Sequence, residues 1–218
     1  MLAMDAAQRL VIPVGQYGGA VRDGGTDTVG YAIRRGHMVF TVPWRQATLW
    51  MEAHGRTADL GRTVWNRSTV LARRTDDTPP EQAEKWFAQL VVLQLFKELD
   101  PDGPEAVDFA RAHRLLPAAP GRGNTSDDPF RFLIGHPPHR TATLEWNDLR
   151  LWRDGYQEPS LWDACVARAA AEERVGYLLD PSRLLVRTLH SLHRMLALRL
   201  GYVDIARRAP SDADGAHG

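Results

Sequence analysis

The chain has 218 residues, of which 44% are hydrophobic and 25% are charged, as is ordinary for a globular protein. Its 27 basic and 27 acidic residues give a formal net charge of zero, which excludes a general polybasic attraction to nucleic acid or to an anionic membrane. The single cysteine, Cys165, excludes an internal disulfide, and no apolar run approaches the roughly 18–20 residues of a membrane span, so we expect a cytoplasmic protein.

The first part of the chain predicts a strand, a loop, a hairpin and three helices. Residues 9–14 (RLVIPV) favour a strand, and the five glycines of residues 15–27 favour a loop. The β-favouring residues on both sides of Arg35-Gly36 predict a hairpin at residues 29–42. Pro43 suits the first turn of a helix and Gly55 suits its end. The three helices are expected at residues 43–55, 57–74 and 80–99.

The second part predicts the same order of elements. A hairpin, three helices and a short strand are expected at residues 130–144, 145–155, 159–174, 181–200 and 201–205. Between the two parts we expect a helix at residues 103–117 and an exposed linker at residues 118–129. The predicted domains are residues 1–100, a connection at 101–128, residues 129–206, and a disordered tail at 207–218.

Two ten-residue segments of the chain share four identical positions. TVPWRQATLW and TLEWNDLRLW place Trp44 and Trp50 at a constant offset of 102 positions from Trp146 and Trp152. The same offset pairs apolar residues on the last helix of each part, which indicates an internal duplication. We therefore predict an α+β, mainly helical fold of two tandem winged helix-turn-helix-like units, each a hairpin followed by three helices. In each unit one tryptophan is expected to pack on the sheet and the other on the third helix.

A family resemblance follows from this order of motifs. The hairpin followed by FTVPWRQATLW, HG, RTADL and PPEQAEKWFAQLVVLQLFKEL resembles the domains related to pyrroloquinoline-quinone biosynthesis protein D. Such domains also recognise precursor peptides in ribosomal peptide natural-product pathways. Residues 29–99 and 130–205 both resemble the pattern, although the second copy has DGY in place of HG and a hairpin that contains HPPH.

The sequence contains few catalytic or metal-binding motifs. It has no G-x-S-x-G, H-E-x-x-H, C-x-x-C or Walker A motif. Cys165 lies on a predicted helix without an identifiable activating base, so we expect it to be buried. A set of four histidines, His136, His139, His190 and His193, could bind zinc if the second hairpin met its third helix. Histidine is also common where apolar and charged faces meet, and we expect no metal and no cofactor.

One basic stripe distinguishes the two copies. On the last helix of the second copy, the basic residues recur at intervals of four, three and four, at Arg183, Arg187, His190 and Arg194. The first copy has other residues at these positions, Glu81, Lys85, Ala88 and Val92. A solvated helix face would explain the stripe, and so would a groove that binds phosphates or an acidic peptide.

The resemblance implies a peptide-binding function. In such domains an extended precursor segment adds to the edge strand of the hairpin and lies against the third helix. The corresponding site here would combine the strand at His139, Arg140 and Thr141 with the basic stripe, and an acidic leader peptide would be presented to a partner enzyme. The chain itself would not be an enzyme. DNA binding by the third helix is the alternative, and a scaffolding role is a third.

Overall fold

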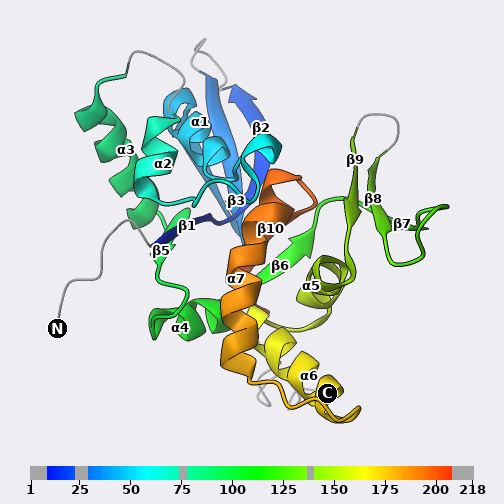
Figure 1. The fold of residues 1–218 in the computed structure, drawn as a ribbon. Coiled ribbons are helices and arrows are strands. Elements are labelled where there is room, and N and C mark those ends of the chain that lie inside the picture. Colours follow the sequence, from blue (N-terminus) through cyan, green and yellow to red (C-terminus); the bar gives the residue numbers. More distant parts are fainter. Residues whose placement is uncertain (1–8, 23–28, 74–77, 137–139, 208–218) are drawn as a thin grey trace, which may run out of the picture.

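The computed structural model describes residues 9–22, 29–73, 78–136 and 140–207 (Figure 1). Over these ranges the chain has an α+β fold, in which helices pack beside small antiparallel sheets. Two of these sheets have two strands and two have three strands. No helix in the described ranges is both long and apolar enough to cross a membrane. From residue 208 onward, the predicted tail lies outside the described residues.

The first half contains a three-stranded sheet, a two-stranded sheet and three α-helices. Its elements in chain order are β1 (Leu10–Pro13), β2 (Gln16–Arg22), β3 (Val29–Arg35), β4 (Met38–Pro43), α1 (Trp44–Glu52), the 3₁₀ turn η2 (Thr57–Asp59), α2 (Arg67–Ala72), α3 (Pro80–Val92) and β5 (Phe96–Leu99). Strands β2, β3 and β4 form one sheet, and β5 returns to pair antiparallel with β1. Helix α4 (Glu105–Ala112) then leads into the second half.

The second half repeats this order. Its elements are β6 (His113–Pro117), β7 (Gly121–Asn124), β8 (Phe132–His136), β9 (Arg140–Leu144), α5 (Trp146–Gln157), α6 (Leu161–Glu173), α7 (Pro181–Ala197) and β10 (Gly201–Ile205). Strands β7, β8 and β9 form a sheet, and β10 returns to pair antiparallel with β6. Each half is therefore a strand, a three-stranded sheet, three helices and a closing strand.

Local details recur at matching positions of the two halves. Trp44 and Trp146 are the first residues of α1 and α5, and their rings lie 5.0 Å from Tyr31 and 5.7 Å from Phe132, respectively. Helices α3 and α7 are both followed by a residue with a positive φ, Gln94 (56°) and Arg199 (57°), before the closing strand starts. Helix α7 has 17 residues and α3 has 13, so the offset between the halves changes along this helix.

The predicted loop and linker are wrong in part. The glycine-rich residues 15–27 contain strand β2, and the predicted linker contains strand β7, so each predicted hairpin forms two strands of a three-stranded sheet. Glycine is usually depleted in strands, but here it has a geometric use. The register shifts between Tyr17 and Gly19 and between Gly121 and Gly123, and both Gly19 (φ 98°) and Gly123 (φ 92°) have left-handed backbones. Glycine therefore marks a bulge in each outer strand.

Several predicted helices are shorter than expected. The helix predicted at residues 57–74 is only η2 and α2, because Gly61 (φ 73°) leaves the helical region and Asn66 starts a new helix by accepting the Thr69 N–H at 2.9 Å. The helix predicted to residue 99 ends at Val92, because the following residues pair with β1 as strand β5. The helix predicted at residues 103–117 likewise ends at Ala112, and β6 follows. The strand predicted at residues 9–14, the hairpin at 29–42 and the strand at 201–205 are confirmed.

Strand β1 separates two hydrophobic cores and contributes to both. Leu10, Ile12 and Val14 belong to the core formed mainly by α4 to α7, and Val11 belongs to the core formed by α1 to α3. Successive side chains of a strand point to opposite faces, so a strand with a core on each side is buried along its whole length, as β1 is. The two halves therefore share strand β1, although the predicted domain boundary lies at residues 101–128.

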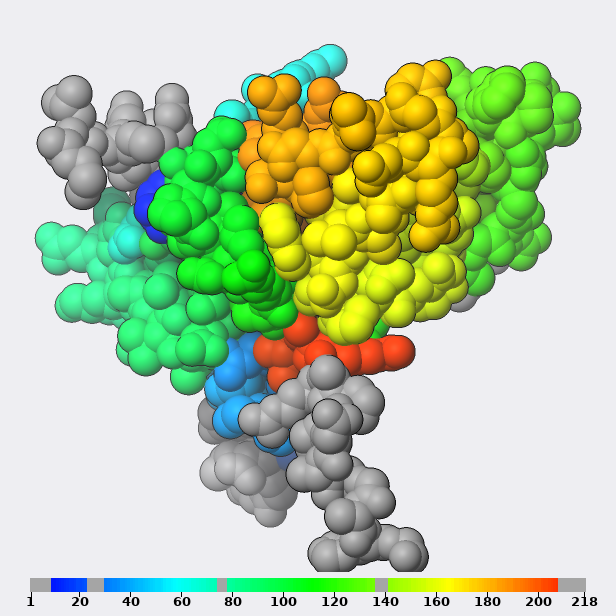
Figure 2. Space-filling model, turned by 90° about the horizontal axis from the view of Figure 1, so that it is seen from below, coloured from blue at the N-terminus to red at the C-terminus, as the bar shows by residue number. Residues whose placement is uncertain are grey.

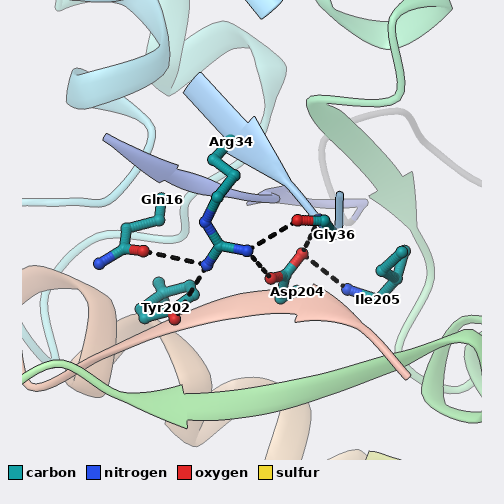
Figure 3. A network of polar contacts seen from close by, with 6 residues as sticks. All are labelled: Gln16, Arg34, Gly36, Tyr202, Asp204 and Ile205. Atoms are coloured by element: carbon teal, nitrogen blue, oxygen red, sulfur yellow. Dashed lines mark hydrogen bonds and ion pairs between the residues drawn. The ribbon is translucent and has the colours of Figure 1, made fainter. Parts of the chain in front are cut away.

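A polar network also joins the halves (Figure 3). The Asp204 carboxylate, on β10, accepts the Gly36 N–H at 2.7 Å and lies 3.4 Å from the Arg34 guanidinium. Arg34 also donates to Gln16 at 3.0 Å and to the Tyr202 hydroxyl at 3.2 Å. Figure 2 shows the red strand β10 directly beside the blue strands of the first half. This network ties the β3–β4 turn to the second half.

Candidate functional site

Helix α7 carries the predicted basic stripe and is fixed in place by its opposite face. Its first turn is capped by Asp180, whose carboxylate accepts the Ser182 N–H at 2.9 Å. The buried apolar side chains of α7 are Leu184, Leu185, Leu189, Leu192, Met195, Leu196 and Ala197. Because these residues enter the core, the helix cannot rotate, and its basic positions face outward or toward the rim of the core.

The four members of the stripe have different surroundings. Arg183, Arg187 and His190 are exposed, and their side chains form no hydrogen bond or ion pair with the part of the chain that the structure describes. Arg194 lies 3.1 Å from the carboxylate of Asp148, on α5. Burial raises the pKa of Asp148 above its ordinary value, and the charge of Arg194 opposes that rise. The side chains of Arg183, Arg187 and His190 therefore remain available to a ligand.

The end of the stripe enters a cleft between the two halves. This cleft has a volume of about 700 Å³ and lies between α7 and residues 60–65 of the first half. His190 and Arg194 line it from α7, and Arg62 and Trp65 line it from the first half. Arg183 and Arg187 lie further toward the N-terminus of α7 and are not part of its lining. Figure 2 shows a cyan segment of the first half at the edge of the orange α7.

His193 is a buried structural residue. Its Nε2 donates a hydrogen bond to the main-chain oxygen of Val11 at 2.8 Å, and its ring lies 6.3 Å from the Trp65 ring. Burial lowers the pKa of His193 to about 4, so the ring is neutral at pH 7. It therefore connects α7 to β1 rather than facing His190. The other two histidines considered for zinc, at 136 and 139, have side chains outside the described residues. Residues of the described ranges form no cluster of three or more metal-ligating side chains.

Strand β9 is the outer strand of its sheet and presents an open edge. It has β8 on one side, and the sheet order β7-β8-β9 places no described strand on the other side. Gly135 of β8 donates its N–H to Pro120, toward β7, so its partner on β9, Thr141, is in a non-hydrogen-bonded pair. By the period of two, Thr143 is oriented in the same way. The main-chain N–H and C=O groups of Thr141 and Thr143 therefore point to the open edge.

The predicted site residues lie on two separate surfaces. Thr141 is exposed on β9, the side chain of Arg140 lies outside the described part, and His139 is not described at all. Figure 1 shows α5 between β9 and α7, and α5 contacts both elements. The structure thus brings the basic residues together on α7 but keeps them apart from β9. It adds Arg62 to them, which sequence reasoning missed because residues 60–65 were expected to be helical.

The tryptophans are divided between the core and the surface. Trp50 is 1% exposed and donates its Nε1–H to the Val14 oxygen at 3.2 Å, and half-buried Trp152 donates to the Leu200 oxygen at 3.0 Å. Trp44 and Trp146 pack on aromatic residues of the sheets but remain 52% and 46% exposed. The predicted burial of Cys165 is confirmed, and burial raises the pKa of its thiol.

Neither a family model, nor a curated protein, nor a solved structure matches this chain.

Proposed function

We propose that this chain is a non-catalytic, cytoplasmic binding protein made of two tandem winged helix-turn-helix-like units. In this proposal it recognises an acidic precursor or leader peptide by strand addition and presents it to a partner enzyme of ribosomal peptide natural-product biosynthesis. The observation that carries the proposal is the open edge of β9, where Thr141 and Thr143 direct unpaired main-chain groups outward. The family resemblance of both units supports it.

An open edge is a ready acceptor for an extended peptide. Its main-chain groups can form a further ladder of hydrogen bonds, and these give affinity that depends little on peptide sequence. The side chains of Thr141 and Thr143 are exposed on one face of the strand, and Ala142 between them is half-buried. Threonine is β-branched and favours a strand, so the edge is ordered before a peptide arrives. Less conformational entropy is then lost on binding.

The exposed basic residues of α7 support an acidic ligand. Arg183, Arg187 and His190 have no acidic partner among the described residues, although the chain as a whole has as many acidic as basic residues. Unpaired positive charge on one helix attracts an anionic ligand over several ångströms and accelerates its association. The corresponding helix α3 has one basic residue, Lys85, together with the acidic residues Glu81 and Glu84, so the second half is the one suited to an acidic peptide.

Strand addition can be tested by replacing Thr143 with proline. Peptides would first be selected from a random display library against the full chain, and their affinity measured by fluorescence anisotropy. Thr143→Pro removes an outward N–H and leaves the β8–β9 hydrogen bonds in place. We expect it to weaken binding by about tenfold or more, whereas Thr143→Val keeps the affinity.

Hydrogen exchange provides a second readout of the same site. A bound strand should slow exchange of the Thr141 and Thr143 amide protons in the unsubstituted chain. If the library gives no binding peptide, or if a selected peptide slows neither amide proton and binds Thr143→Pro as tightly as the parent, strand addition at β9 is wrong.

DNA binding is the second candidate, and the outer face of α7 favours it. The third helix of a winged helix-turn-helix unit is the one that enters the major groove, and α7 exposes Arg183, Arg187 and His190 there. Binding to phosphates would make the affinity fall steeply with salt concentration. A labelled duplex that binds in a salt-dependent manner and is lost on Arg183→Glu would favour this function over peptide capture.

A further inference from the structure

The cleft between α7 and residues 60–65 combines positive charge with polar donors. Arg62 is exposed, and its side chain forms no hydrogen bond or ion pair within the described ranges. Arg194 and His190 face it across the cleft, and the hydroxyl-bearing residues Thr63 and Ser191 also line it. With Asp148 as the single acidic group among the lining residues, two arginines and one carboxylate leave the cleft with a net positive charge.

The lining of the cleft also includes apolar residues. Trp65 is 2% exposed and Leu10 is 3% exposed, yet both contribute to its lining, and Val64 is 55% exposed at its edge. The volume of about 700 Å³ lies within the range of roughly 300–1,000 Å³ typical of ligand sites. The cleft therefore suits a ligand that carries anionic groups together with apolar ones.

We infer that this cleft binds the carboxylate and apolar side chains of the acidic peptide, which would then contact both halves of the protein. The inference rests on the proposed peptide-binding function and assigns a place to the acidic part of the ligand. Carboxylates can form charge-assisted hydrogen bonds with Arg62, and a ring N–H of His190 can donate a further hydrogen bond. Apolar side chains of the peptide would contact Trp65 and Leu10.

The composition of the cleft favours a peptide over a nucleic acid. A phosphodiester backbone brings a continuous series of negative charges, and the Asp148 carboxylate would face it from within the cleft. A peptide can place single carboxylates opposite Arg62 and keep them away from Asp148. Arg183 and Arg187, which DNA would contact on the outer face of α7, have no role in this cleft.

The charge of Arg62 can be tested against that of Arg174, which follows the last residue of α6. Both side chains are exposed arginines without a hydrogen bond or ion pair in the described ranges, but only Arg62 lines the cleft. Arg174 belongs neither to β9 nor to the basic stripe of α7, so Arg174→Glu is a matched control for Arg62→Glu. With an acidic peptide selected from the display library, we expect Arg62→Glu to weaken binding by about tenfold and Arg174→Glu by less than about threefold. Residual association-rate effects of Arg174→Glu should vanish at high salt.

A double-mutant cycle identifies the contact itself. Replacing each acidic residue of the selected peptide with its amide should weaken binding to the parent chain, and for at least one position that loss should be much smaller with Arg62→Gln. Equal effects of Arg62→Glu and Arg174→Glu, or additivity at every peptide position, would overturn the cleft assignment. Thr143→Pro separates this result from the proposed function. If Thr143→Pro abolishes binding while the arginines are equivalent, strand addition stands and the cleft assignment falls.

Discussion

Removing the Asp204 carboxylate should destabilise the protein because this group joins the two halves. Asp204 is 2% exposed and accepts two main-chain N–H groups, from Gly36 at 2.7 Å and from Ile205 at 3.0 Å. Arg34 adds an ion pair at 3.4 Å. After Asp204→Ala, both N–H groups and the guanidinium lose this acceptor, and water cannot readily replace it because the site is buried.

The size of the effect follows from these contacts. Breaking a buried ion pair typically costs about 3–5 kcal/mol, and an unsatisfied buried group about 1–3 kcal/mol. Arg34 is 38% exposed and keeps its hydrogen bonds to Gln16, Tyr202 and the Gly36 oxygen. The expected loss of stability therefore lies at the lower end of these ranges. We expect Asp204→Ala to lower the free energy of unfolding by about 2–4 kcal/mol. Urea denaturation followed by far-UV circular dichroism measures this directly.

Glu84→Ala is the matched control for this substitution. Glu84 also forms an ion pair with an arginine, Arg67, but its side chain is 47% exposed, and Arg67 keeps a second partner in Glu98. Exposed pairs of this kind contribute little, so Glu84→Ala should change the free energy of unfolding by less than about 1 kcal/mol. Equal losses for the two variants would show that the Asp204 network does not hold the halves together.

Two further predictions concern the core. Trp50→Ala should destabilise the protein by about 3–5 kcal/mol, as other large core truncations do, whereas Trp44→Ala, at 52% exposure, should cost less than about half as much, and thermal melts of both variants test this contrast. The pKa of buried His193 is lowered to about 4, below the unfolded value of 6.5, so the unfolded chain binds more protons between these pH values. Stability should therefore fall as pH drops from about 6.5 to about 4, and His193→Gln, which can still donate to Val11, should reduce this slope; an unchanged slope in urea titrations across this range would contradict it.

The elements that could be predicted from the sequence are those specified by residues close together in the chain. The duplicated tryptophans lie at matching places, because Trp44 and Trp146 are the first residues of α1 and α5, and each helix begins within two residues of the end of a strand. Proline at the start of α3 and of α7 marks a helix N-terminus, which needs no tertiary information. The basic stripe of α7 was visible for the same reason, since residues three and four apart on a helix share a face.

Elements fixed by distant contacts could not be predicted in this way. Strand β5 continues an apolar helical pattern but becomes a strand because it pairs with β1, at Leu10 and Leu99. Strand β2 has the composition of a loop, and its pairing with β3 overrides that composition. The cleft depends on Arg62, which is 128 positions before His190 in the chain, and no periodic pattern connects such residues.

Because the two halves share strand β1, a charged residue of one half can contribute to the cleft only when the other half is also present. Because β1 buries Leu10 and Ile12 in the core of the second half, residues 60–65 of the first half are held opposite α7. The His193 hydrogen bond to Val11 fixes α7 to the same strand. Exposed positions of α7 contribute little to stability, so this helix can carry basic residues that α3 lacks without destabilising the fold. Each half supplies one wall of the cleft, and neither half alone contains it.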